Sequence, residues 1–337
     1  MVNLFKKKLL AFILILICGK SVQTSADFTF QSKIYVAGHN GLVGSAIVRA
    51  LTVQGYTNII TCNSKEVDLR RQDQVEAFFN REKPEYVFLA AAKVGGIKAN
   101  MTYPADFIYD NLAIELNVIK AAFKYKTKKL LFLGSSCIYP KFASQPMVED
   151  CLLTSKLEPS NEYYAIAKIA GIKLCEAFNK QYPDQTKFIS CMPCNLYGPG
   201  DNWNLETSHV LTALIQKIYR AKQDQLSTVM LLGTGNARRE FLHADDVALA
   251  CILLMQNYTD NQPINIGSGQ DLTIRELADK IKTILGYTGE IKFNAEFPDG
   301  TPQKLLNINK ITNLGWQPLI NLDYGINLMT QEYYKLK

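Results

Sequence analysis

A run of apolar and β-branched residues, KIYVAG at 33–38, is followed at once by three glycines spaced three apart. Gly38, Gly41 and Gly44 form a GxxGxxG turn, and the amphipathic stretch SAIVRALTVQG follows it. A strand, a glycine turn and a helix in this order place backbone N–H groups at a helix N-terminus, where they can bind a pyrophosphate. The triplet alone is weak evidence, because any tight turn uses glycine.

Later segments repeat the alternation of strand and helix and so strengthen this interpretation. Short apolar runs typical of buried strands occur at 58–62, 85–90, 129–135 and 187–192, with helical patterns between them. Alternating β and α units predict a parallel sheet with helices on both faces. We therefore expect an α/β fold, a Rossmann-like doubly wound parallel sheet that binds a dinucleotide, with a smaller C-terminal lobe.

Charge and cysteine content exclude several classes of protein. The 337 residues include 37 Lys and Arg and 31 Asp and Glu, so the net charge is only +6. No basic stripe is interleaved with aromatic residues, and we expect no nucleic-acid partner. The eight cysteines have neither the spacing of a zinc site nor that of a disulfide framework. We expect no metal.

The first thirty-one residues form a separate problem. KKK followed by LLAFILILIC has the pattern of a signal peptide and is too short for a comfortable membrane span. A start codon assigned upstream of the true one would give the same pattern. We expect residues 1–31 to be a leader or a mis-assigned start, and a chain starting near Ser32 to fold and be active.

Three polar residues after the fourth predicted strand can carry chemistry. Ser135 stands at the tip of that strand, and Tyr164 and Lys168 lie four apart on a predicted helix over 161–178. The ammonium one turn away is expected to lower the pKa of the tyrosine, whose reference value is ~10. Tyr-x-x-x-Lys alone is common on helix surfaces. With the glycine turn and the serine, the set resembles the extended short-chain dehydrogenase/reductase superfamily.

Longer segments narrow the resemblance. LAAAKVGGIKAN (89–100), GSSCIYPK (134–141), YAIAKIAGIKLCE (164–176), REFLHADD (239–246) and DGTPQKLL (299–306) resemble the GDP-L-fucose synthase family. The likeness runs from residue 32 to the end of the chain. It implies conversion of GDP-4-keto-6-deoxy-D-mannose to GDP-L-fucose by 3,5-epimerisation and 4-reduction.

This resemblance assigns roles to five residues. Cys137 and His209 would exchange the protons at C3 and C5, where a thiol and an imidazole suit the work because both titrate near neutrality. Ser135 and Tyr164 would hold the C4 oxygen, and Lys168 would assist the tyrosine and bind the nicotinamide ribose. Without the resemblance, the cysteine could be a packed thiol and the histidine a helix cap. The alternative functions are another nucleotide-sugar epimerase or dehydratase, or a non-catalytic NADP-binding module.

The expected cofactor is NADPH. An NAD enzyme usually ends its second strand with a carboxylate for the ribose 2′-OH. Here the sequence is Cys62-Asn63-Ser64-Lys65, with no acid before Glu66, and a hydroxyl and an ammonium suit a 2′-phosphate. The resemblance implies cofactor contacts at Gly38, His39, Asn40, Gly41, Leu42, Val43, Gly44, Ser64, Lys65, Asp68, Leu69, Leu133, Gly134, Ser135, Ser136, Lys168, Pro193, Cys194, Asn195, Leu196 and His209.

Substrate contacts and assembly are also implied by the resemblance. Lys217, Leu232, Arg239 and Asp299 match positions that contact the GDP-sugar, with lysine and leucine standing where relatives carry arginine and tryptophan. We expect residues 32–198 and 240–270 to form the NADP-binding domain, and residues 199–239 and 271–337 to form the substrate lobe. A homodimer, a cytoplasmic location and no stable membrane association are further expectations.

Overall fold

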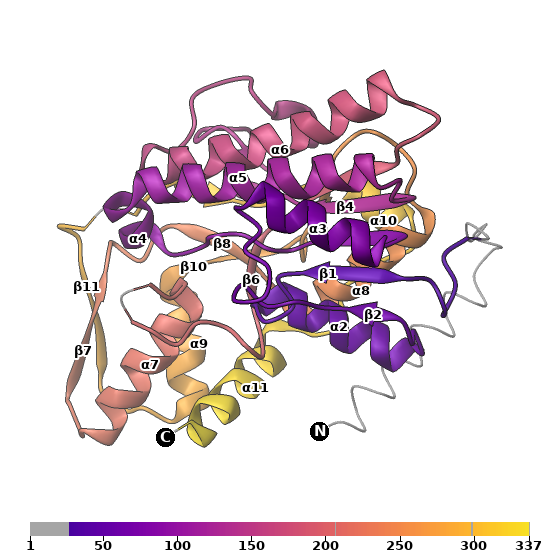
Figure 1. Ribbon diagram of the computed structural model, residues 1–337. Coiled ribbons are helices and arrows are strands. Elements are labelled where there is room, and N and C mark those ends of the chain that lie inside the picture. Colours follow the sequence, from indigo (N-terminus) through magenta and orange to yellow (C-terminus); the bar gives the residue numbers. More distant parts are fainter. Residues whose placement is uncertain (1–26, 206, 298, 337) are drawn as a thin grey trace.

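The computed structural model describes residues 27–205, 207–297 and 299–336, and a parallel sheet lies at its centre (Figure 1). The six strands of that sheet run in the order β2-β1-β3-β4-β5-β9. This confirms the predicted Rossmann-like α/β fold. The strand order reverses between β1 and β3, where open α/β sheets bind their ligands. The strands are β1 (Ile34–Ala37), β2 (Ile59–Ile60), β3 (Tyr86–Leu89), β4 (Lys129–Leu133), β5 (Phe188–Pro193) and β9 (Ile264–Ile266).

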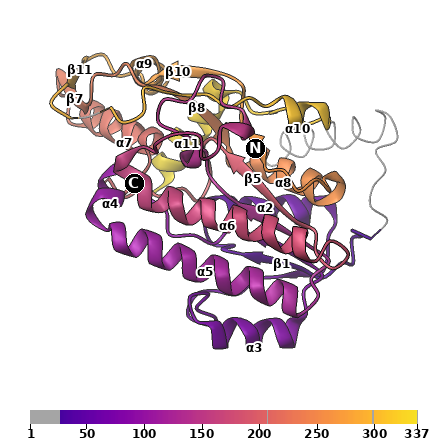
Figure 2. The same ribbon diagram turned by 90° about the horizontal axis from the view of Figure 1, so that it is seen from above.

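Helices cover both faces of the sheet. Figure 1 shows α3 (Gln72–Glu82), α5 (Pro104–Lys124) and α6 (Glu162–Gln181) on one face, and α2 (Leu42–Gln54) and α8 (Ala244–Asn257) on the other. Figure 2 shows α5 and α6 running side by side along the outside of the molecule. Every residue of β1, β3, β4 and β5 is buried, as expected for a sheet covered on both sides.

A smaller lobe lies beside the carboxyl ends of the strands. Strand β8 (Arg238–His243) pairs with β6 (Asn195–Tyr197), β10 (Asp271–Thr273) and β12 (Gln303–Lys304), while β7 (Thr228–Leu232) pairs with β11 (Glu290–Asn294). Helices α7 (Val210–Gln223), α9 (Ile274–Leu285) and α11 (Leu322–Lys335) bury a second apolar core against these strands. The remaining elements are α4 (Ile97–Thr102), α10 (Asn309–Asn313) and the single turns η1 (Ser136–Ile138), η2 (Glu149–Cys151) and η3 (Pro159–Asn161).

The two cores divide the chain differently from the boundaries that the sequence predicted. Leu306, Ile311 and Trp316, which were expected in the substrate lobe, are buried in the core of the main sheet. Strand β8 serves both cores, because successive side chains of a strand point to opposite faces. Phe241 packs in the small core and Leu242 in the large one. The lobe and the main domain therefore share a rigid strand.

Packing begins before Ser32. Phe28 is buried, and its ring lies 4.9 Å from that of Tyr56 and 4.6 Å from that of Tyr86, measured between centroids. The Ser32 hydroxyl accepts a hydrogen bond from the backbone N–H of Thr29. Most of the expected leader, residues 1–26, lies outside the described residues. Among the described residues, no helix is long and apolar enough to cross a membrane.

Two truncated chains would separate residues 27–31 from the preceding segment. A chain starting at Asp27 should match the full chain in stability, whereas a start at Ser32 should lose about 2 kcal/mol, because Phe28 and its ring contacts are removed. Thermal unfolding of the two truncated forms measures this difference. Phe28→Ala in the longer form should reproduce the loss, and Phe30→Ala, at a side chain 54% exposed, should not. Equal melting temperatures for both starts would contradict the prediction.

Candidate functional site

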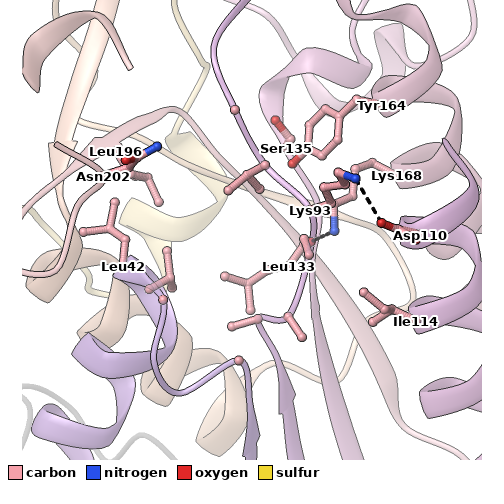
Figure 3. A pocket seen from close by; sticks show the side chains of 18 of the residues that line it. Leu42, Lys93, Asp110, Ile114, Leu133, Ser135, Tyr164, Lys168, Leu196 and Asn202 are labelled. Atoms are coloured by element: carbon pink, nitrogen blue, oxygen red, sulfur yellow. Dashed lines mark hydrogen bonds and ion pairs between the residues drawn. The ribbon is translucent and has the colours of Figure 1, made fainter. Parts of the chain in front are cut away.

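A cavity of about 750 Å³ lies at the carboxyl ends of β1, β3 and β4, at the switch point of the sheet. Figure 3 shows Ser135, Tyr164 and Lys168 together on one side of this cavity and Leu42 on the other. The cavity brings together most residues that the sequence predicted for cofactor and catalysis. Those that line it are Gly38, His39, Asn40, Gly41, Leu42, Val43, Ser64, Asp68, Leu69, Leu133, Gly134, Ser135, Ser136, Cys137, Tyr164, Lys168, Pro193, Cys194, Asn195, Leu196 and His209.

The glycine turn forms one end of the cavity and has the form of a phosphate cradle. Gly38 has φ +85°, and a Cβ there would lie 2.7 Å from the backbone of Ala91. A Cβ at Gly44 would collide with the carbonyl oxygen of Gly38. Gly41 is the N-cap of α2, and no side chain caps that end of the helix. The first N–H groups of α2 and its positive dipole end are therefore available to a pyrophosphate.

The turn after β2, residues 61–66, lines part of the cavity, and no carboxylate of this turn points into it. Ser64 is part of the wall. The exposed Lys65 follows it and is not part of that wall. The carboxylate of Glu66 turns back and accepts a hydrogen bond of 3.0 Å from the backbone N–H of Asn63. The wall at this point suits an anionic 2′-phosphate better than a hydroxyl that needs an acid.

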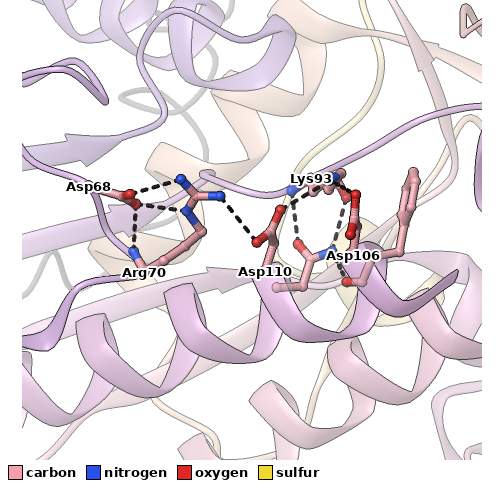
Figure 4. Close-up of polar contacts among 7 residues, drawn as sticks. Asp68, Arg70, Lys93, Asp106 and Asp110 are labelled. Atoms are coloured by element: carbon pink, nitrogen blue, oxygen red, sulfur yellow. Dashed lines mark hydrogen bonds and ion pairs between the residues drawn. The ribbon is translucent and has the colours of Figure 1, made fainter. Parts of the chain in front are cut away.

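Ion pairs connect this wall to α5 (Figure 4). The Arg70 guanidinium donates to Asp68 at 2.8 Å and to Asp110 at 3.3 Å. The Lys93 ammonium contacts Asp110 at 3.1 Å and Asp106 at 2.9 Å. The bonds from Arg70 hold the pKa of Asp68 below its usual range. Both cations are thus balanced by carboxylates and fix the wall to the helix.

The predicted trio of Ser135, Tyr164 and Lys168 lies together in the cavity wall, with a partner that the sequence did not predict. The Lys168 ammonium contacts the Glu115 carboxylate at 3.1 Å, and both side chains are 2% exposed. It also donates to the Leu133 carbonyl at 3.0 Å. Glu115 comes from α5, so the pair joins the two outer helices beneath the cavity. Removing one member of such a buried pair is strongly destabilising.

The expected direction of the Tyr164 pKa is wrong for the chain by itself. Burial raises the pKa of Tyr164, and nearby Cys137 and Glu115 raise it further, while Ser135 lowers it. The Lys168 ammonium lies 6.0 Å from the centre of the tyrosine ring. The Glu115 carboxylate that pairs with Lys168 is thus one of the groups that oppose ionisation of the phenol. Tyr164 is accordingly a proton donor at neutral pH.

Cys137 lies in η1, directly after β4, with its sulfur in a polar environment. The sulfur accepts hydrogen bonds from the Asn161 amide at 3.2 Å and from the Lys304 ammonium at 3.5 Å. Burial raises the pKa of Cys137, but Lys304, Ser135 and Arg239 lower it by more, so the net pKa is below the usual value. This cysteine has the environment of a reactive thiol rather than of a packed one.

His209 is the second proton-transfer candidate and lines the same cavity as Cys137. It is the N-cap residue of α7, although its side chain does not cap the helix. Its side chain is therefore available to a ligand. Burial lowers the pKa of His209.

The four predicted substrate residues divide into two groups. Arg239 on β8 and Asp299 lie together, since the guanidinium donates to the Asp299 carbonyl at 3.1 Å. The Asp299 carboxylate accepts from the backbone N–H of Thr234, just beyond the exposed Leu232 at the end of β7. Lys217 is on α7. None of the four residues Lys217, Leu232, Arg239 and Asp299 lines the cavity described above. Burial lowers the pKa of Lys217.

Comparison with known proteins agrees with this geometry. Residues 34–267 match the model of the NAD dependent epimerase/dehydratase family. The chain is 54% identical over 316 residues to GDP-L-fucose synthase 1 from Arabidopsis thaliana, which covers 94% of this chain and 96% of the relative. The chain belongs to the GDP-L-fucose synthase family. The sequence interpretation is thereby confirmed at the level of the family.

Solved structures related to this family have the same fold. A GDP-L-fucose synthetase from Naegleria fowleri with bound NADP superposes with a TM-score of 0.85 at 27% identity, covering 93% of this chain and 97% of that one. A GDP-6-OMe-4-keto-L-xylo-heptose reductase from C. jejuni gives 0.87 at 38% identity, covering 92% and 99%. Members of the fold thus include both a fucose synthetase and a heptose reductase.

Several residues of this family member escaped prediction from the sequence. Glu115 could have been found as one carboxylate inside the apolar run AIELNV, where a buried partner is needed. Asn161 is one helical turn before Tyr164, and this spacing is only a weak indication of a functional residue. Lys304 belongs to the segment DGTPQKLL, which is one of those that resemble the family. From that segment, however, only Asp299 was predicted as a site residue. No local pattern connects Lys304 with a cysteine 167 positions earlier.

Proposed function

We propose that this protein converts GDP-4-keto-6-deoxy-D-mannose to GDP-L-fucose with NADPH, by epimerisation at C3 and C5 and then reduction at C4. The observation that carries the proposal is the joint presence of Cys137 and His209 in one cavity with Ser135 and Tyr164. A reductase needs only the hydroxyls that hold the ketone oxygen. A double epimerisation needs in addition an acid and a base, and Cys137 and His209 can supply them.

NADPH fits the site on two observations. A Cβ at Gly38 or Gly44 would collide with neighbouring backbone, so only glycine allows this tight turn, and the buried Nδ1 of His39 has no partner among the described residues. The turn and the N-terminus of α2 would hold the pyrophosphate, Ser64 and Lys65 the 2′-phosphate, and Lys168 the nicotinamide ribose. When bound, NADPH supplies the hydride for C4.

The chain itself provides the proton chemistry. The ketone at C4 acidifies the protons on C3 and C5, and Cys137 as thiolate accepts each of them in turn. His209 as imidazolium gives a proton to the opposite face, which inverts the carbon. Ser135 and Tyr164 donate hydrogen bonds to O4 and stabilise the enolate. In the reduction step Tyr164 gives its proton to O4, consistent with its raised pKa.

Binding of the GDP portion is assigned to the smaller lobe. The Arg239 side chain is partly buried yet has no side-chain carboxylate bonded to it among the described contacts, so its fork is available to a diphosphate. Asp299 is fixed by the N–H and hydroxyl of Thr234 and positions the neighbouring loop. Lys217 and Leu232 would contact the substrate from outside the cavity wall.

A turnover assay tests the proposal. The purified full chain should oxidise NADPH in the presence of GDP-4-keto-6-deoxy-D-mannose, and NMR of the product should show GDP-L-fucose. The reductase among the structural neighbours gives a second candidate, a C4 reductase of a GDP-heptose without epimerisation. That candidate would give a product with unchanged C3 and C5 configuration. If NADPH is oxidised with neither sugar, the proposal is refuted, and the protein would be a non-catalytic NADP-binding module.

Cofactor preference can be tested at the end of β2. With Ser64 and Lys65 near the ribose and no carboxylate in the β2 turn facing the cavity, kcat/KM should be higher with NADPH than with NADH. Lys65→Glu should lower this ratio about tenfold by repelling the 2′-phosphate. Lys33→Glu, at a lysine remote from the cavity, is the matched control and should leave the ratio unchanged. A wild-type preference for NADH would refute the assignment.

The homodimer is proposed from the outer face of α5 and α6. Tyr109 and Leu116 on α5 are 70% and 51% exposed, and Tyr163 and Ile166 on α6 are 48% and 39% exposed. Apolar side chains at these levels on two adjacent helices are unusual for a surface that faces only water. A second copy in an isologous contact would cover them. Light scattering that gives a monomer at micromolar concentration would contradict a dimer.

A cytoplasmic location is proposed from the chemistry. The nucleotide sugar and NADPH are both made in the cytoplasm, and a thiol with a lowered pKa at Cys137 would be oxidised in an extracellular compartment. N-terminal sequencing of the endogenous protein after cell fractionation tests the proposal. A mature exported form beginning just after Ala26 would refute it.

A further inference from the structure

The sulfur of Cys137 is approached by donors from three separate parts of the chain. Asn161, just before α6, donates at 3.2 Å, and Lys304 on β12 donates at 3.5 Å. Arg239 on β8 adds positive charge nearby. The titratable group that faces the sulfur from α6 is Tyr164, which is protonated. Every one of these groups can stabilise a thiolate.

The backbone around Lys304 is fixed, so its ammonium has a defined position. The amide of Gln303 donates to the Asp271 carboxylate at 2.7 Å. The N–H of Leu305 donates to the Gln145 side chain at 2.8 Å. Strand β12 is also paired with β8, with Lys304 opposite Arg239. These contacts hold the residue on both sides.

Among the residues that the structure describes, Lys304 has no competing anion. Within the described part of the chain, no carboxylate lies at ion-pair distance from its ammonium, whereas Lys168 is paired with Glu115. A partly buried cation is stabilised by an anion close to it. The Cys137 sulfur is the group in position to provide that charge. A thiolate paired with an ammonium satisfies both groups.

We propose that Lys304 is a positioning residue that keeps Cys137 as a thiolate before the substrate binds. This inference deepens the proposed function by assigning how its base is charged. In each epimerisation the C–H bond breaks, an S–H bond forms, and His209 gives a proton to the carbon. The thiol then releases its proton to solvent, and solvent restores that of His209.

The first test needs no substrate. Iodoacetamide alkylation of the full chain is followed from pH 5 to 10, and the modified Cys137 peptide is quantified by mass spectrometry. In the wild type, the midpoint should be below the ordinary thiol value of ~8.5. Lys304→Met should raise the midpoint by at least one pH unit, and Lys304→Arg should restore it. Lys292→Met, at an exposed lysine of β11, is the matched control and should match the wild type.

The second test measures the reaction. Lys304→Met should lower solvent-deuterium incorporation at C3 and C5 at least tenfold at pH 7. Melting temperature and NADPH binding of each variant separate this effect from misfolding, and Lys304→Arg provides a folded, charged form if the methionine variant fails to fold. An unchanged alkylation midpoint, or unchanged deuterium incorporation, overturns the proposal. If the wild type does not act on the keto sugar, the proposed function fails, while alkylation still decides whether Lys304 holds a thiolate.

Discussion

Replacing Tyr164 with phenylalanine is expected to lower the rate of C4 reduction about 10³-fold, while the sugar still exchanges its C3 and C5 protons. In the proposed mechanism the phenol is the proton donor to O4, and its raised pKa keeps it protonated across the working pH range. Ser135 remains as a donor to the enolate. Cys137→Ser should instead lose exchange at C3 and C5 while it keeps the capacity for reduction. A serine hydroxyl is too weak an acid to ionise and act as the base in place of the thiolate. NADPH oxidation and deuterium incorporation measured on the same samples separate the two steps.

The controls for these variants are binding and folding. Both variants should bind NADPH and melt close to the wild type, since each removes or exchanges a single atom. Full GDP-L-fucose formation by Cys137→Ser would refute the role of the thiol. Complete loss of exchange in Tyr164→Phe would instead show that the phenol is needed for both steps.

In the proposed mechanism, Cys137 and His209 also determine the pH dependence of exchange. The base must be a thiolate, which exists above the pKa of Cys137, and that pKa is lowered. The acid must be an imidazolium, which exists below the pKa of His209, and that pKa is lowered as well. Both limbs of the profile therefore move toward acid. Exchange should decline as the pH rises beyond neutrality, and a maximum near pH 9 would contradict these roles.

Replacing Glu240 with alanine is expected to destabilise the protein by about 4 kcal/mol, the largest stability effect that we predict. Glu240 on β8 is fully buried, and its carboxylate accepts from the backbone N–H of Gly269 at 2.6 Å and of Leu306 at 3.0 Å. Burial raises the pKa of Glu240 to about 7 although these bonds lower it. The alanine leaves the buried N–H of Leu306 and the partly buried N–H of Gly269 without this partner, and it opens a cavity.

The midpoints of urea unfolding, followed by tryptophan fluorescence, check this value. Glu290→Ala, at a carboxylate 63% exposed on β11, is the matched control and should change stability by less than 0.5 kcal/mol. Leu306 lies two residues after Lys304, so Glu240→Ala should also weaken deuterium incorporation. A stability within 1 kcal/mol of the wild type would mean that water replaces the carboxylate without loss.

The sequence predicted well those features that one continuous stretch of the chain encodes. The glycine turn at Gly38 and the helix with Tyr164 and Lys168 follow from local geometry and from periodicity. The contacts of Lys168 with Glu115 and of Cys137 with Lys304 were missed, because each joins residues that only the folded chain brings together. The pKa direction of Tyr164 was wrong for the same reason. The spacing of four revealed the ammonium but not the carboxylate beside it.

The end of the packed N-terminal region was also misplaced, for a different reason. The apolar pattern begins clearly at Ile34, but Phe28 is a single aromatic outside any periodic segment. Its burial depends on Tyr56 and Tyr86, which belong to later units of the sheet. Isolated anchors of this kind leave no repeating signal in a sequence.

The position of Cys137 in a single turn outside β4 has an evolutionary consequence. Its backbone is set by the Ser135 hydroxyl and by the end of the strand, neither of which depends on the identity of the side chain at 137. Under the proposed mechanism, one codon change there would remove the inversion of stereocentres and leave a working ketone reducer. New sugar products can therefore arise in descendants of this scaffold without rebuilding the fold, since in this mechanism the thiol serves inversion and has no part in reduction.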